Sequence, residues 1–303
     1  MEARAAACPR PYDGASPWHR PIARHPQVLD RSRALVNAIA DNGLPLTSDV
    51  DQYTIALYET DAETPLRTVA LSGWFSSYDR GDASRAGHGA SPTVDGVPVP
   101  GDAEAPAGSD GQVVFWDVRS GVEYGFWRFR KDAAGNYSAQ NGYRYHTRAG
   151  YRGRFADGKA GRGAGLPYLA GLVRRCELAR GRIDHALAFA YDSPAPTFVY
   201  PASKSDGAGV PGVDLPEGTR LQLNPNLREA DFDAWGLSRE AKTIARALQT
   251  YGMYVVDNSG SSKLYLEAQE TAAWDEGVTR TLVSGIPWHE FRVIAPPSAT
   301  PSR

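Results

Sequence analysis

The amino-acid sequence predicts a mainly β protein, an antiparallel β-sandwich or jelly roll into which a few helices are inserted. Segments rich in β-branched and aromatic residues, such as 53–58 and 68–72, follow one another and are separated by turn formers. The helical patterns do not alternate regularly with the strands, which disfavours a doubly wound parallel sheet. The 31 Gly and 22 Pro residues among 303 also indicate many turns.

The chain is expected to form one large domain with short extensions at both ends. Residues 1–29 contain many Pro and Arg residues around Trp18 and lack the apolar spacing of a regular element. We expect this segment to wrap a single β-rich domain formed by residues 30–295, and residues 296–303 to form a loose tail. A chain of this length is compatible with one all-β domain.

Two segments have the apolar spacing and the end signals of a helix. The first follows Asp30, a suitable N-cap, and ends at Gly43, whereas the second follows Ser238 and ends at Gly252. A shorter helical stretch is expected to end near Arg180. The segment from Asn224 to Trp235 is expected to be a turn or a short helix.

The strongest strand signals are three consecutive segments and one isolated segment. Residues 112–118, 122–130 and 137–147 are joined by short turns, which predicts an antiparallel meander. Residues 183–191 alternate large side chains with mostly alanine, and His185 falls on the face of the large residues. Because small residues allow another segment to approach closely, we expect this to be an inner strand.

Three long loops, at 76–111, 148–171 and 201–219, are rich in turn formers and are expected to border a groove. Long loops in compact domains commonly carry function. The glycine-rich loop 148–171 matches neither a phosphate-binding loop nor a dinucleotide fingerprint, so a mobile loop that faces a ligand is the preferred interpretation.

Charge and hydropathy exclude two classes of partner. The 33 basic and 35 acidic residues give a net charge of −2 and are not gathered in long blocks, which argues against general nucleic-acid binding. No stretch approaches the roughly 18 consecutive apolar residues of a membrane span. The sequence therefore predicts neither a nucleic-acid partner nor a membrane span.

The N-terminal segment and the cysteines leave the compartment open. The start of the chain lacks the apolar run of a signal peptide, which fits a cytosolic protein or an exported one whose leader is missing from this reading frame. Cys8 and Cys176 permit one disulfide in an oxidising compartment, and two ordinary thiols are the alternative.

His185 is the strongest single candidate for proton transfer, because imidazole titrates near neutral pH. The structural alternative is a buried, hydrogen-bonded histidine within an apolar strand. Lys204 and Asp206 lie in a loop directly after a short strand, where either a functional group or a solvated turn is expected. If the consecutive strands pair as a hairpin, His185, Lys204 and Asp206 should reach one cleft.

Aromatic residues indicate the ligand class. Rings that border a groove stack on the apolar faces of sugars, while Arg and Asp bind hydroxyl groups; packing in the core is the alternative for most of the rings. The candidate substrate contacts are Trp74, Trp127, Tyr145, Arg182 and Asp257.

Other acidic residues and the histidines give weaker chemical signals. Glu229, Asp231 and Asp233 have the spacing of a glycosidase carboxylate pair on a strand, although their flanking residues favour a helix start. The histidines lack metal-binding spacing, so we predict no metal site and no required cofactor. Calcium could bind the hard oxygens of Asp49 and Asp51, although no EF-hand loop is present.

Seven segments of the sequence carry a broader resemblance. They are SPWHRPI, AETPLRTV, GSDGQVVFWDVRSGVEYGFW, GLPYLAGLVRRCELARGRIDHALAFAY, FVYPASKSDG, PEGTRLQLNP and IARALQTYGMYVVDN. Together they resemble a group of secreted actinobacterial proteins, from about Ser16 to Phe291. The resemblance implies an exported, extracellular protein and no particular activity.

These observations predict an exported protein that cleaves a polysaccharide or oligosaccharide as a hydrolase or a lyase. His185 would act as acid or base, Lys204 or Arg182 would neutralise developing charge, and Asp206 or Asp257 would supply the carboxylate. The alternative is a noncatalytic carbohydrate-binding or surface-adhesion module that uses the same loops only to bind.

Overall fold

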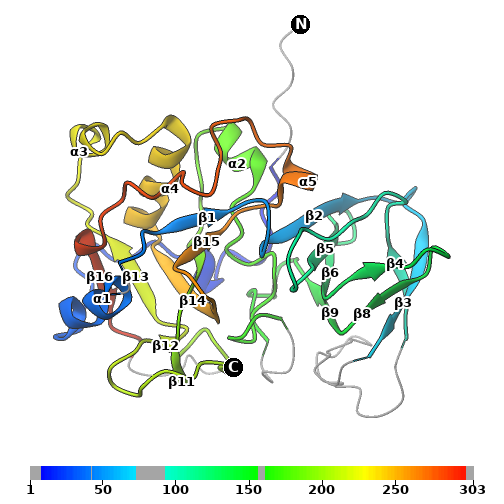
Figure 1. Ribbon diagram of the computed structural model, residues 1–303, viewed down its shortest axis with the longest axis horizontal. Helices are drawn as coiled ribbons and strands as arrows, with labels where there is room; N and C mark the ends of the chain where they lie inside the picture. The colour runs from blue at the N-terminus through cyan, green and yellow to red at the C-terminus, as the bar shows by residue number, and fades with distance from the viewer. Residues whose placement is uncertain (1–7, 42, 73–92, 156–160, 298–303) are drawn as a thin grey trace, which may run out of the picture.

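The computed structural model describes residues 8–41, 43–72, 93–155 and 161–297. The protein is mainly β, as predicted, and forms two lobes that lie side by side along the long axis (Figure 1). The larger lobe contains a six-stranded sheet and all five α-helices of the described residues, whereas the smaller lobe contains two four-stranded sheets.

The six-stranded sheet forms the centre of the larger lobe. Its strands, in spatial order, are β1 (Thr47–Asp49), β15 (Lys263–Tyr265), β10 (Leu187–Tyr191), β14 (Met253–Asn258), β13 (Arg220–Leu223) and β16 (Phe291–Ile294). The inner position predicted for segment 183–191 is confirmed for β10, which pairs with β14 on one side and β15 on the other. The strand begins later than predicted, because the backbone bends at His185.

Alanines on one face of β10 allow close packing between the lobes. Leu187 and Phe189 pack on one side of the sheet with the helices, whereas Ala188 and Ala190 belong to a second apolar cluster that also contains residues of the smaller lobe. Ala188 N–H donates to the Gly171 carbonyl at 2.9 Å, an approach that a larger side chain would hinder. The predicted alternation of large and small residues is therefore present in β10.

The helices lie around the six-stranded sheet. They are α1 (Ser32–Ala40), α2 (Arg175–Ala179), α3 (Glu229–Ala234), α4 (Arg239–Thr250) and α5 (Gln269–Ala272), with 3₁₀ turns at Pro17–His19 and Trp288–Glu290. The Ser238 side chain caps α4 by accepting from Ala241 N–H, as predicted. Glu229 and Asp231 lie in the first turn of α3. They therefore belong to a helix start, as their flanking residues indicated, and do not form a carboxylate pair on a strand. None of the helices in the described ranges is long and apolar enough to cross a membrane.

The smaller lobe consists of two sheets that enclose a shared apolar core. One sheet contains β2 (Ile55–Thr60), β5 (Gln112–Asp117), β6 (Val122–Trp127) and β9 (Asn141–His146); the other contains β4 (Thr93–Pro98), β3 (Leu66–Leu71), β8 (Tyr137–Ala139) and β7 (Arg130–Lys131). A further pair, β11 (Ala195–Phe198) and β12 (Pro216–Glu217), lies on the larger lobe (Figure 1). Val69, Phe115 and Phe126 are among the residues of the shared core.

The predicted meander is confirmed, except that its third segment is divided between two strands. β5 pairs antiparallel with β6, and β6 pairs antiparallel with β9. The segment predicted as a third strand, 137–147, is divided at Gln140 between β8 in one sheet and β9 in the other. The chain changes sheets at this point, which short turns in the sequence do not reveal.

The sheets are mixed and not purely antiparallel, which differs from the predicted antiparallel sandwich or jelly roll. β2 pairs parallel with β5, and β10 pairs parallel with β14. The chain forms β3 and β4 of the other small sheet between β2 and β5, and it forms β11, β12, β13, α3 and α4 between β10 and β14. Such long excursions allow the returning strand to run in either direction.

The N-terminal segment contacts both lobes. Cys8 forms a disulfide with Cys176 in α2, with 5.4 Å between their Cα atoms. The Tyr12 hydroxyl donates to the Glu123 carboxyl of β6 at 3.0 and 3.1 Å, and the Trp18 indole N–H donates to the Gly153 carbonyl at 2.9 Å. The segment therefore ties the smaller lobe to the larger one.

The buried Glu123 carboxyl should make stability depend on pH. Burial raises its pKa to about 8 from a usual value of 4.5, although the Tyr12 hydrogen bond opposes this shift. The unfolded chain releases this proton near pH 4.5 and the folded protein near pH 8, so the free energy of unfolding should fall as pH rises through that window. At pH 9, the free energy of unfolding of Glu123→Gln should exceed that of the parent by roughly 4–5 kcal/mol.

Urea unfolding of both proteins at pH 5 and pH 9 measures this difference, and comparison with the parent removes the contribution of other titrating groups. The two should have similar stability at pH 5, where both the carboxylic acid and the amide are neutral. An equal difference at the two pH values would show that Glu123 is not protonated in the folded state.

Candidate functional site

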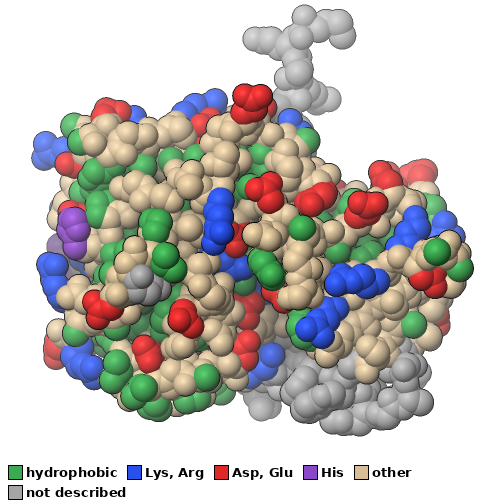
Figure 2. Space-filling view, in the orientation of Figure 1, with side chains coloured by type: hydrophobic (Ala, Val, Ile, Leu, Met, Phe, Trp, Pro, Cys, Tyr) green, Lys and Arg blue, Asp and Glu red, His purple; other side chains and the backbone are tan. Residues whose placement is uncertain are grey.

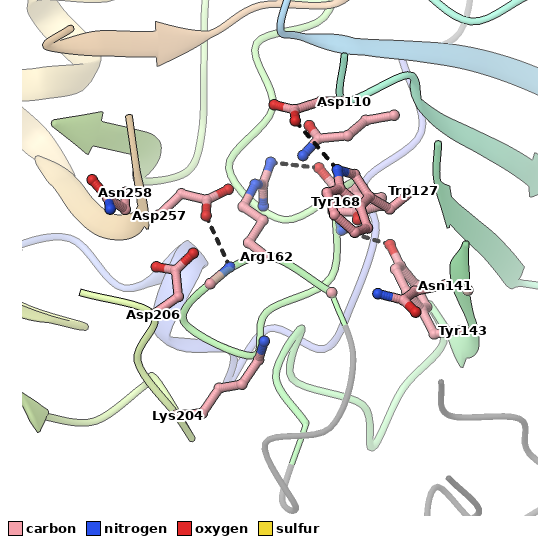
Figure 3. Close-up of a pocket in the computed structure, with 14 residues that line it drawn as sticks. Asp110, Trp127, Asn141, Tyr143, Arg162, Tyr168, Lys204, Asp206, Asp257 and Asn258 are labelled. Carbon is pink, nitrogen blue, oxygen red and sulfur yellow. Dashed lines mark hydrogen bonds between the residues drawn. The ribbon is translucent and has the colours of Figure 1, made fainter. Parts of the chain in front are cut away.

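A polar pocket of about 230 Å³ lies where the two lobes and two of the predicted loops meet (Figure 3). It is lined by Asp110, Gln112, Trp127, Asn141, Gly142, Tyr143, Gly161, Arg162, Gly163, Tyr168, Lys204, Asp206, Asp257 and Asn258. Loops 148–171 and 201–219 both contribute to its wall, and segment 76–111 contributes Asp110. Residues 76–92 of that segment lie outside the described residues, whereas residues 93–98 form the strand β4 and not part of a surface loop as predicted.

A β-bulge places Asp257 on the pocket side of the sheet. Phe189 pairs with Val255, but Ala190 pairs with Asp257, so that Val256 is an extra residue in β14. Side chains alternate between the two faces in a regular strand, and a bulge shifts that alternation by one residue. Asp257 therefore shares the side of Ala190, toward the smaller lobe, instead of the apolar side of Phe189.

The Asp257 carboxylate is held by two donors. Its Oδ1 accepts from Gly163 N–H at 3.0 Å, and its Oδ2 accepts from the Tyr265 hydroxyl at 3.1 Å. Burial and the neighbouring Asp206 charge raise the pKa of Asp257 to about 7, although the Gly163 hydrogen bond and the Arg162 charge oppose the shift. Figure 3 shows the Asp206 and Asp257 carboxylates close to each other in the pocket.

The absence of a side chain at Gly163 allows this close arrangement. A Cβ atom at this position would lie 2.2 Å from Asp206 Oδ1 and 2.7 Å from Asp257 Oδ1. Both separations are far below a van der Waals contact, so a residue with a side chain would displace at least one carboxylate. Gly163 therefore sets the spacing of the two acidic groups.

Glu217 of β12 supplies a third carboxyl group behind the other two. One oxygen from each of Asp206, Glu217 and Asp257 lies within 4.8 Å of the others. Glu217 is 0% exposed, and neither of its oxygens has a hydrogen-bond partner among the described residues. Burial, followed by the charges of Asp206 and Asp257, raises the pKa of Glu217 to about 10.

Arg162 forms a rigid part of the pocket wall. Its side chain is 1% exposed, and its guanidinium donates to the carbonyls of Pro167, Tyr168 and Ala170 at 2.6 to 2.8 Å. The guanidinium also lies 4.9 Å from the centre of the Tyr265 ring. These contacts fold the segment from Arg162 to Ala170 into a turn that places Gly163 against the carboxylates.

An aromatic ring borders the pocket on the side of the smaller lobe. Trp127 is half-buried, and its indole N–H donates to Asp110 Oδ1 at 3.3 Å. The Arg128 guanidinium lies 4.4 Å from the centre of this ring, which favours a fixed ring orientation. Trp127, Lys204, Asp206 and Asp257, all candidates from the sequence, are thus brought together in one pocket.

His185 is not part of this arrangement, so the expected common cleft with Lys204 and Asp206 is not observed. It is buried beside α2, where Nε2 lies 3.0 Å from Glu177 Oε1 and Nδ1 lies 2.9 Å from the Ala186 carbonyl. Both ring nitrogens therefore face acceptors, as expected for a histidine that stabilises the fold. Although burial opposes the shift, the charges of His185 and Arg174 hold the pKa of Glu177 well below its usual range.

Three further candidates from the sequence lie elsewhere. Arg182 is 74% exposed and pairs with Asp184, with Nε 2.6 Å from Oδ1. Tyr145 is buried in the apolar cluster between the lobes, and its hydroxyl donates to the Arg154 carbonyl at 3.0 Å. Trp74 lies outside the described residues.

Asp49, a candidate calcium ligand from the sequence, forms ion pairs with two basic residues. Its carboxylate lies 3.4 Å from Lys263 Nζ and 3.2 Å from Arg280 Nε, while Asp51 is exposed. Neither Asp49 nor Asp51 belongs to the three-carboxylate cluster around Glu217.

Sequence reasoning missed Glu217 because it lies in a very short strand within a loop of turn formers.

Comparison of the chain with protein-family models, with curated proteins and with solved structures finds no match.

Proposed function

We propose that the protein is an exported enzyme that cleaves a polysaccharide in the pocket between the two lobes. The observation that carries the proposal is the convergence of Lys204, Asp206 and Asp257 on an open polar pocket beside Trp127. An exposed ring face can stack on a sugar, while the charged groups bind its hydroxyls and exchange protons with it. Convergent polar groups in a concave site are typical of ligand sites.

A second hollow supports a polymeric substrate. It has a volume of about 460 Å³ and shares Asp110 and Asn258 with the pocket, so the two hollows adjoin. Its wall includes Tyr53, which is 38% exposed, together with the polar residues Ser259 and Ser261. A chain of sugars could therefore continue from the pocket into the neighbouring hollow.

The spacing of the carboxylates limits the reactions that this site would perform. Inverting hydrolysis needs two carboxyl groups roughly 6.5–9.5 Å apart, so that a water molecule fits between them. Oxygens of Asp206 and Asp257 lie within 4.8 Å of each other, which disfavours that mechanism for this pair. Retaining hydrolysis, and elimination with Lys204 as the proton-transfer group, are the reactions compatible with the site.

The disulfide supports the proposed location outside the cell. Cys8 and Cys176 are the two cysteines of the sequence, and they are bonded to each other. Disulfides persist in oxidising compartments and are rare in a reducing cytosol.

Mass spectrometry of products from a panel of neutral and acidic polysaccharides tests the proposal. Products that contain added water identify hydrolysis, and products with an unsaturated terminal uronate identify elimination. We expect Lys204→Ala to lower kcat/KM at least 100-fold, because a positioned proton-transfer group contributes roughly 10²–10⁴-fold. Trp127→Ala should raise KM about tenfold through the lost stacking contact.

Lys131→Ala is the matched control, since Lys131 is exposed on β7 and does not line the pocket. Its kinetics should equal those of the parent. Saturable glycan binding without any product would contradict the enzyme proposal and favour a noncatalytic module. Equal losses in Lys131→Ala and Lys204→Ala would contradict the assignment of the pocket.

A further inference from the structure

We propose that Asp206, Glu217 and Asp257 form a binding site for a divalent cation of the calcium type. The proposal goes beyond glycan cleavage, and its test needs no glycan; because an ion would engage Asp206 and Asp257, it favours elimination with Lys204 over retaining hydrolysis by these two carboxylates. The three residues come from three separate segments: the loop after β11, the strand β12 and the bulged end of β14. Their convergence is therefore a product of the tertiary fold and not of local sequence.

The distances match the size of the proposed ion. Calcium binds oxygen ligands at about 2.3–2.6 Å, so that two ligands of one ion lie up to roughly 4.6–5.2 Å apart. One carboxylate oxygen from each of the three residues lies within 4.8 Å of the others. An ion among them could contact all three residues with little side-chain movement.

The buried carboxyl of Glu217 is the second, independent observation. The residue is 0% exposed, yet neither of its oxygens has a partner within the described parts of the chain. Buried polar groups are almost always hydrogen-bonded or bound to an ion, because an unsatisfied group costs its full desolvation energy. Glu217 points toward two other carboxylates, which cannot donate hydrogen bonds when ionised. A proton on Glu217, which its raised pKa favours, relieves the repulsion in part, and a cation that replaces this proton would bind all three carboxylates at once.

Nearby basic residues donate to other acceptors, although the buried Nε of Arg162 has no hydrogen-bond partner among the described residues. The Arg162 guanidinium donates to three backbone carbonyls, and Lys263 Nζ donates to the Tyr53 carbonyl at 2.7 Å and lies 3.4 Å from Asp49 Oδ2. The two residues moderate the negative potential at Asp257, but neither contacts the unpartnered oxygens of Glu217. Additional positive charge is thus favourable at the cluster.

The donor set selects the class of ion. All three ligands are hard carboxylate oxygens, which suit calcium, magnesium or manganese better than ions that prefer nitrogen or sulfur. Magnesium requires distances of about 2.0–2.1 Å and near-ideal octahedral geometry, whereas calcium accepts irregular sites. Asp206 is exposed and lines the pocket with Asp257, so the remaining coordination positions of the ion would face the pocket.

Titration of the purified, chelator-treated protein with terbium, a luminescent substitute for calcium, tests the proposal without any glycan. The Tyr265 hydroxyl lies 3.1 Å from Asp257 Oδ2, so excitation of aromatic residues should produce terbium luminescence. We expect saturable binding to one site, competition by calcium, and a rise of several degrees in Tm when calcium is added. Glu217→Gln should weaken binding at least 100-fold.

Glu267→Gln provides the matched control, because Glu267 is also a buried carboxyl but lies outside the cluster. It should bind terbium and calcium as the parent does. If Glu217→Gln fails to fold, Asp206→Asn removes an exposed ligand and should produce the same loss of binding. The proposal is overturned if the parent gives neither luminescence nor a calcium-dependent Tm shift, or if the ligand variants bind like the parent.

Discussion

Replacement of Arg162 by Ala is expected to lower the free energy of unfolding by about 3–5 kcal/mol. The guanidinium is buried and donates to the carbonyls of Pro167, Tyr168 and Ala170, all of which would lose a charged donor in the variant. Each buried acceptor left without a partner costs roughly 1–3 kcal/mol unless water reaches it. Urea unfolding followed by circular dichroism measures the loss.

Arg246→Ala is the control for this prediction. Its guanidinium is 48% exposed and pairs with Glu229 at the surface, so the variant should lose less than about 1 kcal/mol. Comparable losses in the two variants would mean that the Arg162 hydrogen bonds do not stabilise the turn. The Arg162 variant should also lose order in the segment that carries Gly163, which amide hydrogen exchange would detect.

The double variant Cys8→Ser, Cys176→Ser is expected to lose about 4 kcal/mol of stability. The two cysteines are separated by 168 residues in sequence, and removal of a link across such a long segment increases the conformational freedom of the unfolded chain. The loss should appear as a lower urea midpoint in the variant, and chemical reduction of the parent should reproduce it.

The disulfide also anchors the N-terminal segment, so its removal should have a local effect. Arg174 donates to the Pro9 carbonyl at 2.6 Å, beside the bridge. Limited proteolysis should therefore cut the variant near Pro9 sooner than the parent. An unchanged urea midpoint together with an unchanged cleavage pattern would exclude a stabilising role for the bridge.

Local signals in the sequence predicted several elements because the relevant interactions are close in sequence. Ser238 caps α4 through a hydrogen bond to Ala241 N–H, three residues away. The turns of the β5–β6–β9 meander are likewise short, and the alternation in β10 follows from the geometry of one strand. Such interactions depend on neighbouring residues and can be derived from a pattern.

The remaining features depend on residues that are far apart in sequence. The parallel pairing of β2 with β5 is determined by the path of the chain through the other small sheet. The alternation in the sequence predicts that His185 lies on an apolar strand face, but the backbone bends at this residue and its ring contacts Glu177 of α2. No local pattern specifies that contact.

The same distinction, between interactions that are local in sequence and those between distant residues, applies to the candidate site. Lys204 and Asp206 could be selected because they occupy a polar loop after a strand, and both line the pocket. Arg162 and Glu217 could not be selected, because their importance lies in burial and in the carbonyls or carboxylates that surround them. Asp257 faces the pocket only because of a bulge in β14, and one sequence does not reveal a bulge.

The connectivity of the two lobes imposes an order on folding during synthesis. β2 to β9, within residues 55–146, form the smaller lobe from one continuous stretch of chain, so its pairings are complete once that stretch has left the ribosome. β1 must wait for its partner β15, which is made more than 200 residues later. Until the last third of the chain is made, β1 lacks its neighbouring strand and the apolar face of α1 lacks β16, so this part of the larger lobe completes its packing only late in synthesis.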